Sequence, residues 1–432
     1  MKRLLIITYY WPPTGGSGVQ RWVKFSKYLP QFGWQPVIYT PENPEQLAID
    51  ESLLSDIPDC AEIIKTHISE PYEIYRRLTG SKGKPQEVNP LNAQKKSLGK
   101  RISLWLRGNL FIPDPRIWWV RPSVSFLEKY LREHPVDAVV TTGPPQSMHL
   151  IGRGLKRRLG VKWIADFRDP WTGLFYFKHL NLTAFARRRH HRLEQSVLDG
   201  CSTVVAVSPF VQKDFQAMTR TPVELITNGY DPEDYANLDI QDGFFNVTHT
   251  GLFAADGNPD VLWKVLAAKC AADPEFDRML RIRLAGKTDP EILASLTAAG
   301  LETHVVNLGY LDHDKAVREQ RNASMLILPL RKEPEYRATL PGKLFEYLAA
   351  RRPVLGIGQK DGAMAGVIAD SGAGRVCGWD EEAAQAAFTD LCWKLYVSGE
   401  TWNGTGNIEQ YSRPVLTARM AALMSSLTAS EK

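Results

Sequence analysis

Short apolar runs alternate with amphipathic stretches along the whole chain, and this alternation constrains the fold more than any other feature. In the first half, the runs that have the composition of buried parallel strands are 4–8, 36–40, 138–142, 162–166 and 203–207. Helical patterns, for example 124–133 and 149–159, lie between them. Strands and helices in this order predict an α/β fold, with a parallel sheet that is covered by helices on both faces.

The second half repeats the pattern after a strong turn signal, Asn228-Gly229-Tyr230-Asp231-Pro232. Its predicted strands are 246–250, 281–285, 304–308, 325–328, 353–357 and 374–377, and its predicted helices include 259–271 and 383–396. Because 432 residues are too many for one ordinary core, we predict two doubly wound domains, 1–232 and 233–410. A last amphipathic helix, 414–427, lies in the terminal segment 411–432, and residues from about 50 to 121 break the alternation and are predicted to be an insertion.

Composition limits the class of protein further. Hydrophobic residues make up 44% of the chain and charged residues 23%, as in ordinary globular proteins. The five cysteines are scattered without the spacing of metal ligands, which indicates reduced thiols in a cytoplasmic protein. No signal peptide or membrane-spanning run is predicted, and the net charge of +5 permits anionic partners without indicating nucleic acid.

Two segments have the pattern of phosphate-binding turns. In the first, Gly15, Gly16 and Gly18 lie between the strand 4–8 and a helical pattern, although no P-loop lysine follows them. In the second, 340–358, a Pro-Gly turn opens a short helix that carries Lys343 in its first turn and Glu346 one turn later. Lys343 can neutralise a phosphate, and Glu346 can accept hydrogen bonds from the hydroxyls of a ribose. The alternatives are a tight turn that needs glycine for folding and a capped surface helix with incidental charges.

Together these segments give the chain its resemblance to a known family. The chain resembles the family 4 glycosyltransferases of the GT-B fold, through YYWPPTGGSGVQR, VVTTGPPQSMHLIG, WIADFRDPW, VVAVSPF, ITNGYD, HTGLF, LAGK, NLGYL and KLFEYLAARRPVL. These pieces run in the family's order to about residue 360. The resemblance implies two Rossmann-like domains that face each other across a cleft, with the last helix crossing back to the first domain. It also implies a retaining, metal-independent hexosyltransferase with no cofactor, which moves a sugar from a nucleotide-sugar to a saccharide or lipid-linked acceptor in surface polysaccharide biosynthesis.

The resemblance also implies which residues bind the donor. They are Gly15, Gly16, Gly251, Lys287, Tyr310, Leu311, Lys343, Leu344 and Glu346, with Lys343 also stabilising the leaving diphosphate. Two departures stand out. Leu252 and Phe253 occupy the place of a diphosphate-binding Arg, and Ala338 stands where many members carry the first carboxylate of an E-x7-E pair. These departures keep open a GT-B nucleotide-sugar 2-epimerase and a non-catalytic nucleotide-sugar-binding scaffold.

The first domain carries the candidate residues on the acceptor side. Asp166, Arg168 and Asp169 directly follow a predicted buried strand, and they are predicted to be catalytic, near the acceptor hydroxyl or the sugar ring. A structural Asp–Arg pair is the alternative. His149 is a candidate acceptor-binding residue, with packing or helix capping as the alternative.

No metal site is predicted from the sequence. Asp312-His313-Asp314 spells a D-x-D, but it follows a strand and is interpreted as the cap of the next helix. His190 and His191 have no ligand partner at metal spacing.

Basic and apolar residues interleave in 95–111, around Trp105. This pattern predicts peripheral contact with an anionic membrane at the inner face of the cell membrane. A solvated helix that packs Trp105 into the core is the alternative.

Overall fold

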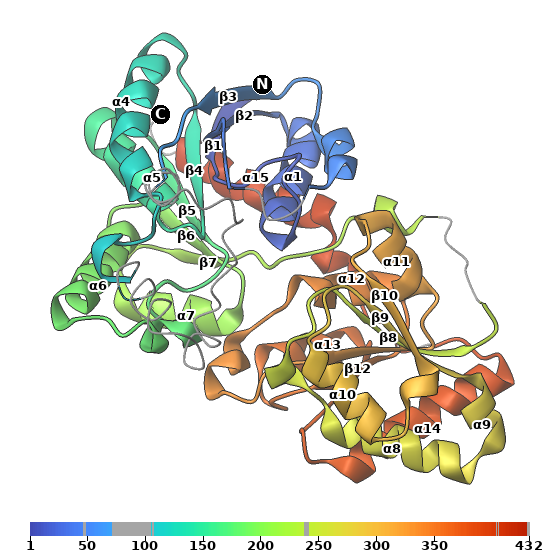
Figure 1. Cartoon of the computed structure of the whole chain (residues 1–432). Helices are drawn as coiled ribbons and strands as arrows, with labels where there is room; N and C mark the ends of the chain where they lie inside the picture. Colours follow the sequence, from blue (N-terminus) through green and yellow to red (C-terminus); the bar gives the residue numbers. More distant parts are fainter. Residues whose placement is uncertain are drawn as a thin grey trace. The chain divides into compact units, whose positions relative to one another are not determined.

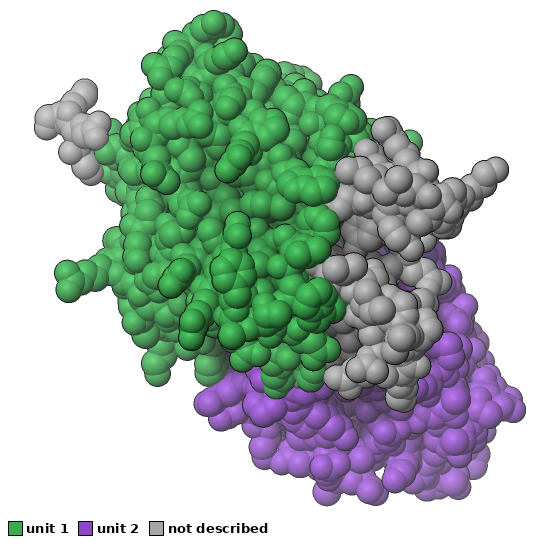
Figure 2. All heavy atoms as spheres, turned by 60° about the vertical axis from the view of Figure 1, so that its left-hand side comes forward, with its two compact units in different colours: residues 1–227, 417–432 green, residues 228–416 purple. Residues whose placement is uncertain are grey.

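The chain folds into two compact units. The computed structural model describes residues 1–45, 49–70, 105, 108–236, 242–402, 404 and 406–429. One unit comprises Met1–Thr227 and Thr417–Lys432, and the other comprises Asn228–Leu416; the two are coloured separately in Figure 2. The division therefore falls at the start of the Asn228–Pro232 turn rather than at its end.

The first unit is built on a seven-stranded parallel sheet with the order β3-β2-β1-β4-β5-β6-β7 (Figure 1). Its strands are β1 (Lys2–Ile7), β2 (Trp34–Pro41), β3 (Glu62–Thr66), β4 (Ala138–Gly143), β5 (Trp163–Phe167), β6 (Thr203–Ala206) and β7 (Val223–Leu225). Leu4 pairs with Pro36 on one side and with Ala138 on the other. Five strands lie where the sequence predicts them. The prediction of an insertion from about residue 50 was wrong over β3, which joins the sheet edge next to β2.

The helices of the first unit connect successive strands. They are α1 (Ser17–Tyr28), α4 (Ile117–Glu133), α5 (Ser147–Leu159), α6 (Ala184–Leu198) and α7 (Pro209–Met218), with the short turns η1 (Leu29–Phe32), η2 (Glu51–Asp56) and η4 (Phe175–His179). The last helix, α15 (Arg413–Ala429), begins in the second unit and continues in the first. In the first unit, Arg419 Nη2 donates to the carbonyl of Leu225 at 2.7 Å and Lys2 Nζ donates to Thr428 Oγ1 at 2.8 Å.

The second unit is built on a six-stranded parallel sheet with the order β10-β9-β8-β11-β12-β13. Its strands are β8 (Phe245–Thr250), β9 (Leu280–Ala285), β10 (Val305–Gly309), β11 (Met325–Pro329), β12 (Val354–Ile357) and β13 (Gly374–Cys377). Its α-helices are α8 (Asp260–Ala272), α9 (Pro274–Met279), α10 (Pro290–Ala298), α11 (His313–Arg321), α12 (Gly342–Ala350), α13 (Ala363–Ser371) and α14 (Glu382–Ser398). Short helical turns are η5 (Pro232–Tyr235), η6 (Ala255–Gly257), η7 (Glu302–His304), η8 (Pro334–Ala338) and η9 (Glu409–Tyr411).

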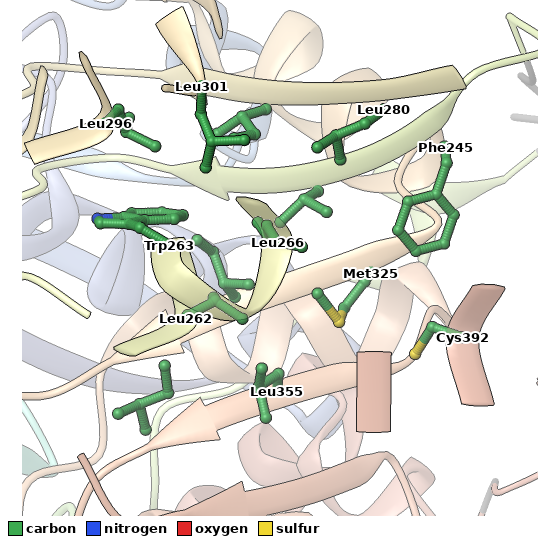
Figure 3. Close-up of a cluster of buried hydrophobic side chains, with 14 of the residues drawn as sticks. Phe245, Leu262, Trp263, Leu266, Leu280, Leu296, Leu301, Met325, Leu355 and Cys392 are labelled. Atoms are coloured by element: carbon green, nitrogen blue, oxygen red, sulfur yellow. The ribbon is translucent and has the colours of Figure 1, made fainter. Parts of the chain in front are cut away.

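The core of the second unit fills the space between its sheet and the helices on one face. Figure 3 shows Leu262, Trp263 and Leu266 of α8 among side chains of the strands, such as Leu280 and Leu355. The central strands β11 and β12 are continuously apolar, as expected where both faces of a sheet are covered, and fully burying one such side chain contributes about 1.5–3 kcal/mol. The core thus fixes the strands, and function is left to the loops at their carboxyl ends.

Within the described residues, the helices are too short or too polar for any of them to cross a membrane. Of the predicted membrane-binding segment 95–111, only Trp105 and residues 108–111 are described, and the rest lies outside the described residues.

Candidate functional site

Three neighbouring strands of the second unit end in glycine turns. Gly251 follows β8, Gly286 follows β9 and Gly309 ends β10, with φ angles of 85°, 139° and 65°. The Gly251 amide donates to the carbonyl of Ala285 at 2.7 Å, and the Gly286 amide donates to the carbonyl of Gly309 at 2.6 Å. A Cβ on Gly286 would lie 2.1 Å from the carbonyl oxygen of Gly251. Glycine is therefore required at position 286, which is buried, while Gly251 is exposed and leaves its backbone accessible at the edge where α/β proteins bind phosphorylated ligands.

Lys343 reaches this edge from the first turn of α12. Its Nζ lies 3.1 Å from His249 Nε2 and 3.3 Å from the carbonyl oxygen of Leu252. A Cβ on Gly251 would be 3.2 Å from the same Nζ. The two segments HTGLF and LPGKLFEYL, far apart in the sequence, therefore meet in one site.

The protonation states of this pair follow from burial. Burial lowers the pKa of Lys343 to about 8, against the charge of Glu346, which raises it. Burial, and then the charge of Lys343, hold the pKa of His249 well below its usual range. The His249 ring also stacks on Phe253, with ring centroids 4.1 Å apart. At neutral pH, a neutral and immobilised imidazole therefore accepts a hydrogen bond from a cationic ammonium group.

Glu346 is held by a chain of polar side chains behind the edge. Gln320 Nε2, from α11, donates to Glu346 Oε2 at 2.9 Å and to Thr250 Oγ1 at 3.1 Å. Tyr235 donates its hydroxyl proton to Gln320 Oε1 at 2.6 Å, and the Thr250 amide donates to the hydroxyl oxygen of Tyr347 at 2.9 Å. These bonds tie the end of β8 to α11 and α12, so the half-buried carboxylate has a fixed position.

The other residues that are predicted to bind the nucleotide-sugar donor differ in where their side chains lie. Lys287 follows Gly286 at the same edge, and its carbonyl accepts a hydrogen bond from the Phe253 amide at 3.0 Å. Tyr310 is exposed after Gly309, with Leu311 half-buried behind it. The side chain of Leu344, in contrast, is fully buried and its amide donates to the carbonyl of Pro341, so it faces the core rather than the edge.

The two departures from the family pattern have structural counterparts. Phe253 is buried beside His249, while Leu252 is exposed, so no side chain at these positions offers a charge to a diphosphate. Lys343 approaches the same turn from α12. Ala338 ends η8 and is half-buried, and it supplies no carboxylate. In the loop after β11, Arg331 forms an ion pair with Asp256 at 2.8 Å.

In the first unit, the glycine-rich loop connects β1 to α1. Gly16, at φ 105°, occupies the N-cap position of α1 and makes no side-chain cap. A Cβ on Gly15 would lie 2.9 Å from Cβ of Asp50, and a Cβ on Gly18 would lie 2.7 Å from Nη1 of Arg168. Close packing around the loop therefore accounts for Gly15 and Gly18, and left-handed backbone accounts for Gly16.

Arg168 connects this loop to the loop after β4. Its guanidinium donates to the carbonyl of Gly18 at 2.5 Å and to the carbonyl of Pro144, and its amide donates to the carbonyl of Gly143 at 2.9 Å. Asp169, the next residue, is exposed. Arg168 therefore holds the ends of two strands together, and Asp169 is the accessible carboxylate of the DFRDPW segment.

Asp166 is fully buried at the end of β5 and forms its ion pair with Arg21, not with Arg168. It accepts hydrogen bonds from Arg21 Nη2 at 2.9 Å, from Trp22 Nε1 at 2.7 Å and from Thr142 Oγ1 at 2.9 Å. Burial alone raises the pKa of Asp166, but the Arg21 charge and these hydrogen bonds bring it below its usual range. The catalytic role of Asp166 stays a prediction, and these contacts favour a structural one.

His149 lies inside the first unit on α5. It is fully buried, its Nδ1 lies 2.8 Å from Thr141 Oγ1, and its ring stacks on Phe167 with centroids 4.3 Å apart. Burial lowers the pKa of His149 to about 3. Its Nε2 has no hydrogen-bond partner within the described residues and lies 2.6 Å from the position of a Cβ on Gly143. These contacts favour the packing alternative, and the acceptor-binding role stays a prediction.

The D-x-D segment lies at the start of a helix, as predicted, but its first aspartate makes no capping hydrogen bond. Asp312 is the N-cap residue of α11, yet its side chain makes no capping hydrogen bond and lies 3.3 Å from Lys315 Nζ. His313 Nε2 lies 2.8 Å from Asp234 Oδ2. Asp312 and His313 are thus directed to different partners.

Sequence reasoning missed three residues that shape the two sites. His249 contacts Lys343, and Gln320 donates a hydrogen bond to Glu346. In the first unit, Arg21 forms an ion pair with Asp166. Each is a buried polar residue within a predicted strand or helix, where polar residues are costly unless they are paired. That cost was the signal that could have identified them.

Two family models match the chain and together span most of it. The model described as Glycosyltransferase Family 4 matches residues 16–234, and the model described as Glycosyl transferases group 1 matches residues 245–393. The first match begins at Gly16, within the glycine-rich loop, and includes DFRDPW. The second includes the strand ends at Gly251, Gly286 and Gly309, here called the glycine edge, together with Lys343 and Glu346. A search of curated proteins finds no match.

Solved structures show the same fold at low identity. A sucrose-phosphate synthase from Thermosynechococcus elongatus is similar over 100% of both chains, with 14% identity and a TM-score of 0.64. A glycosyltransferase from Rickettsia africae is similar over 100% of this chain and 99% of its own, with 11% identity and a TM-score of 0.62. WaaG, a glycosyltransferase involved in lipopolysaccharide biosynthesis, is similar over 98% and 99%, with 14% identity and a TM-score of 0.57. With its two parallel-sheet units of GT-B type, the chain belongs to glycosyltransferase family 4.

Proposed function

We propose that this glycosyltransferase moves a hexosyl group from a nucleotide-sugar to a saccharide or lipid-linked acceptor, with retention of configuration, in surface polysaccharide biosynthesis. The observation that supports it most is the position of Lys343. Its ammonium group lies against the glycine turn at the end of β8, within the part of the chain that matches the group 1 glycosyltransferases. An ammonium beside accessible backbone is a suitable site for a diphosphate.

In the proposed reaction, the bond between the sugar and the diphosphate breaks and negative charge develops on the leaving oxygen. Lys343 and the first amides of α12 stabilise this charge, which is largest in the transition state. Glu346, fixed by Gln320, accepts hydrogen bonds from the ribose hydroxyls. Because protein groups supply the positive potential, the proposed transfer is independent of a divalent ion. Asp169 is the accessible carboxylate of its segment, and we propose it for the acceptor side.

A panel of nucleotide-sugars tests the proposal directly. Unfolding temperature is measured with each one, because a ligand that binds only the folded state stabilises it by RT ln(1 + [L]/Kd). Each nucleotide-sugar that raises the unfolding temperature is then incubated with saccharide and lipid-linked acceptors, the products are identified by mass spectrometry, and the anomeric configuration of the new bond is determined by NMR. Transfer with retention supports the proposal.

The same panel separates the two alternatives. Conversion of UDP-N-acetylglucosamine without an acceptor would identify an epimerase. Binding without any turnover would identify a non-catalytic scaffold.

We further propose that segment 95–111 contacts an anionic membrane, where a lipid-linked acceptor would be found. Its interleaved basic and apolar residues support this proposal. Charge reversal at Lys100 and Arg101 should weaken co-sedimentation with anionic vesicles, most strongly at low salt. If the wild-type chain does not sediment with vesicles, the membrane proposal is wrong.

A further inference from the structure

Three potential metal ligands from three separate elements meet at the amino-terminal edge of the six-stranded sheet. Cys270 lies near the end of α8, Asp277 lies in α9, and His304 ends η7 directly before β10. Their ligand atoms, Sγ, a carboxylate oxygen and an imidazole nitrogen, all lie within 4.8 Å of one another. Residue numbers 270, 277 and 304 form no recognisable metal spacing, so only the fold brings this cluster together.

The orientation of His304 is the most informative part of the cluster. Its Nε2 lies 3.1 Å from Asp277 Oδ1, and its Nδ1 lies 3.3 Å from the carbonyl oxygen of Leu280. When a carbonyl receives the Nδ1 proton, the lone pair of a neutral imidazole is on Nε2, directed at the carboxylate. A histidine that binds a metal usually donates its other ring proton to a carbonyl or carboxylate in this way. In this tautomer the Nε2 lone pair and the carboxylate oxygen face each other as two acceptors, which a cation between them would satisfy; in the other neutral tautomer Nε2 donates to Asp277.

The ligand types limit which cation fits. We propose that Cys270, Asp277 and His304 bind a zinc-class transition metal ion. A thiolate and an imidazole are ligands of Zn²⁺ and Co²⁺, whereas Mg²⁺ and Ca²⁺ prefer oxygen alone. Zinc bonds of about 2.0–2.3 Å place tetrahedral ligands somewhat over 3 Å apart, so small side-chain rotations are sufficient. Cys270 and His304 are half-buried and Asp277 is about half exposed, which leaves room for water as the fourth ligand.

Two neighbouring charged residues, Lys269 and Asp273, have partners of their own. Lys269 directs its Nζ to Asp390 at 2.6 Å. The carboxylate of Asp273 accepts from the amides of Glu275 and Phe276 and from Trp393 Nε1, so it caps α9. Asp273 is therefore occupied but adds negative potential near the cluster, which favours a cation.

The location indicates a structural role. β9 begins at Leu280 and reaches the glycine edge at Gly286, so the two sites lie on the order of 17–20 Å apart along the strands. A metal ion here would connect α8, α9 and the start of β10, and it would not contact a donor at Gly251. The inference is therefore independent of the proposed transferase chemistry.

Cobalt spectroscopy on the full chain tests the site. The chain is stripped with a chelator and titrated with Co²⁺, whose thiolate complexes absorb in the near ultraviolet. We expect one equivalent to bind with this absorption, to be displaced by Zn²⁺, and to raise the unfolding temperature. The absorption should disappear in Cys270→Ser, and metal affinity should fall at least tenfold in His304→Gln and Asp277→Asn.

Cys60→Ser is the matched control, because Cys60 is also a half-buried free thiol but lies in the first unit. It should bind Co²⁺ as the wild type does. The inference is overturned if the wild-type chain binds no equivalent of Co²⁺ or Zn²⁺. It is also overturned if Cys270→Ser keeps the absorption.

Discussion

Lys343 has three N–H donors, and acceptors within the described part of the chain occupy two of them. His249 Nε2 takes one and the carbonyl of Leu252 takes another. Both acceptors are immobilised, His249 by stacking on Phe253 and Leu252 by its place in the turn after β8. The third donor is therefore preorganised for a ligand, and little side-chain entropy is lost when an anion binds.

Replacing Lys343 with Ala should lower kcat by about 10²–10³-fold, because in the proposed reaction it removes a charge that acts mainly on the developing leaving group. Steady-state kinetics with the donor identified in the nucleotide-sugar panel measures this. Lys315→Ala, at an exposed position of α11, is the matched control and should keep wild-type kcat. Equal turnover in the two variants would remove Lys343 from the mechanism.

The pH profile should reveal the same group. Because the pKa of free Lys343 is lowered to about 8, the ammonium is charged below that pH and is lost above it. We expect kcat/KM for the donor to fall about tenfold per pH unit above about pH 8. Lys343→Arg, whose guanidinium stays charged, should abolish this decline even if its activity is lower. A decline that persists unchanged in the Arg variant would assign the titration to another group.

Glu346→Gln keeps the shape of the side chain and removes its charge. Since hydrogen bonds to charged groups contribute about 1.5–3 kcal/mol, donor affinity should fall about tenfold or more. Calorimetry with the nucleotide-sugar measures it. Glu291→Gln, at an exposed position of α10, should bind as the wild type does. Wild-type affinity in the Glu346 variant would mean that this carboxylate does not contact the donor.

At the scale of elements, the glycine turns determine how the strand ends pack. The turn after β9 leaves no room for a side chain, because the Gly251 carbonyl lies where a Cβ of Gly286 would be. The site therefore depends on contacts between turns as well as on the residues that face a ligand.

Gly286→Ala should lower the free energy of unfolding by about 1–3 kcal/mol and weaken donor binding, since it combines a clash with a backbone of φ 139°. Gly366→Ala is the matched control. Gly366 lies inside α13 with open space around it, so Ala there should stabilise the helix by up to about 1 kcal/mol. Thermal unfolding of both variants measures the difference. Wild-type stability in the Gly286 variant would show that the turns after β8 and β9 can shift to make room for a side chain.

Most elements were predictable from the sequence because period and composition are local properties. The buried strands of both sheets lie within a residue or two of their predicted positions. β7 was missed because it has only three residues, and β3 because its side chains are alternately half-buried and exposed at the sheet edge. Lys343 and Glu346 were predicted from a local turn and helix. His249, Gln320 and the cluster of Cys270 could not be placed, because their contacts join residues far apart in the sequence.

At the scale of the whole molecule, the two proposals place a cation at each end of the same six-stranded sheet. One is an ammonium at the carboxyl ends of the strands, and the other is the proposed metal ion at their amino ends. The two have different sensitivities to a chelator, which makes their roles separable.

Treatment with EDTA should leave the transfer rate unchanged and lower the unfolding temperature. In the proposed reaction Lys343 rather than a divalent ion stabilises the leaving group, so the rate should be unaffected, and the stability should fall because the proposed zinc ion is removed. Assays well below the unfolding temperature, with Cys270→Ser as the control that no longer responds to EDTA, check both parts. Loss of transfer that an added divalent ion restores would contradict the metal-independent mechanism.

The two units differ in how the chain forms them. The second unit is one continuous segment, Asn228–Leu416, whereas the first is assembled from both ends of the chain. The two ends of the segment are bonded to each other, through the Tyr230 amide and the Tyr411 carbonyl at 3.1 Å and the Arg413 amide and the Tyr230 carbonyl at 2.8 Å. In topological terms the second unit is an inserted domain whose two ends are joined by hydrogen bonds, an arrangement in which a domain can be replaced without changing the order of segments in the first unit.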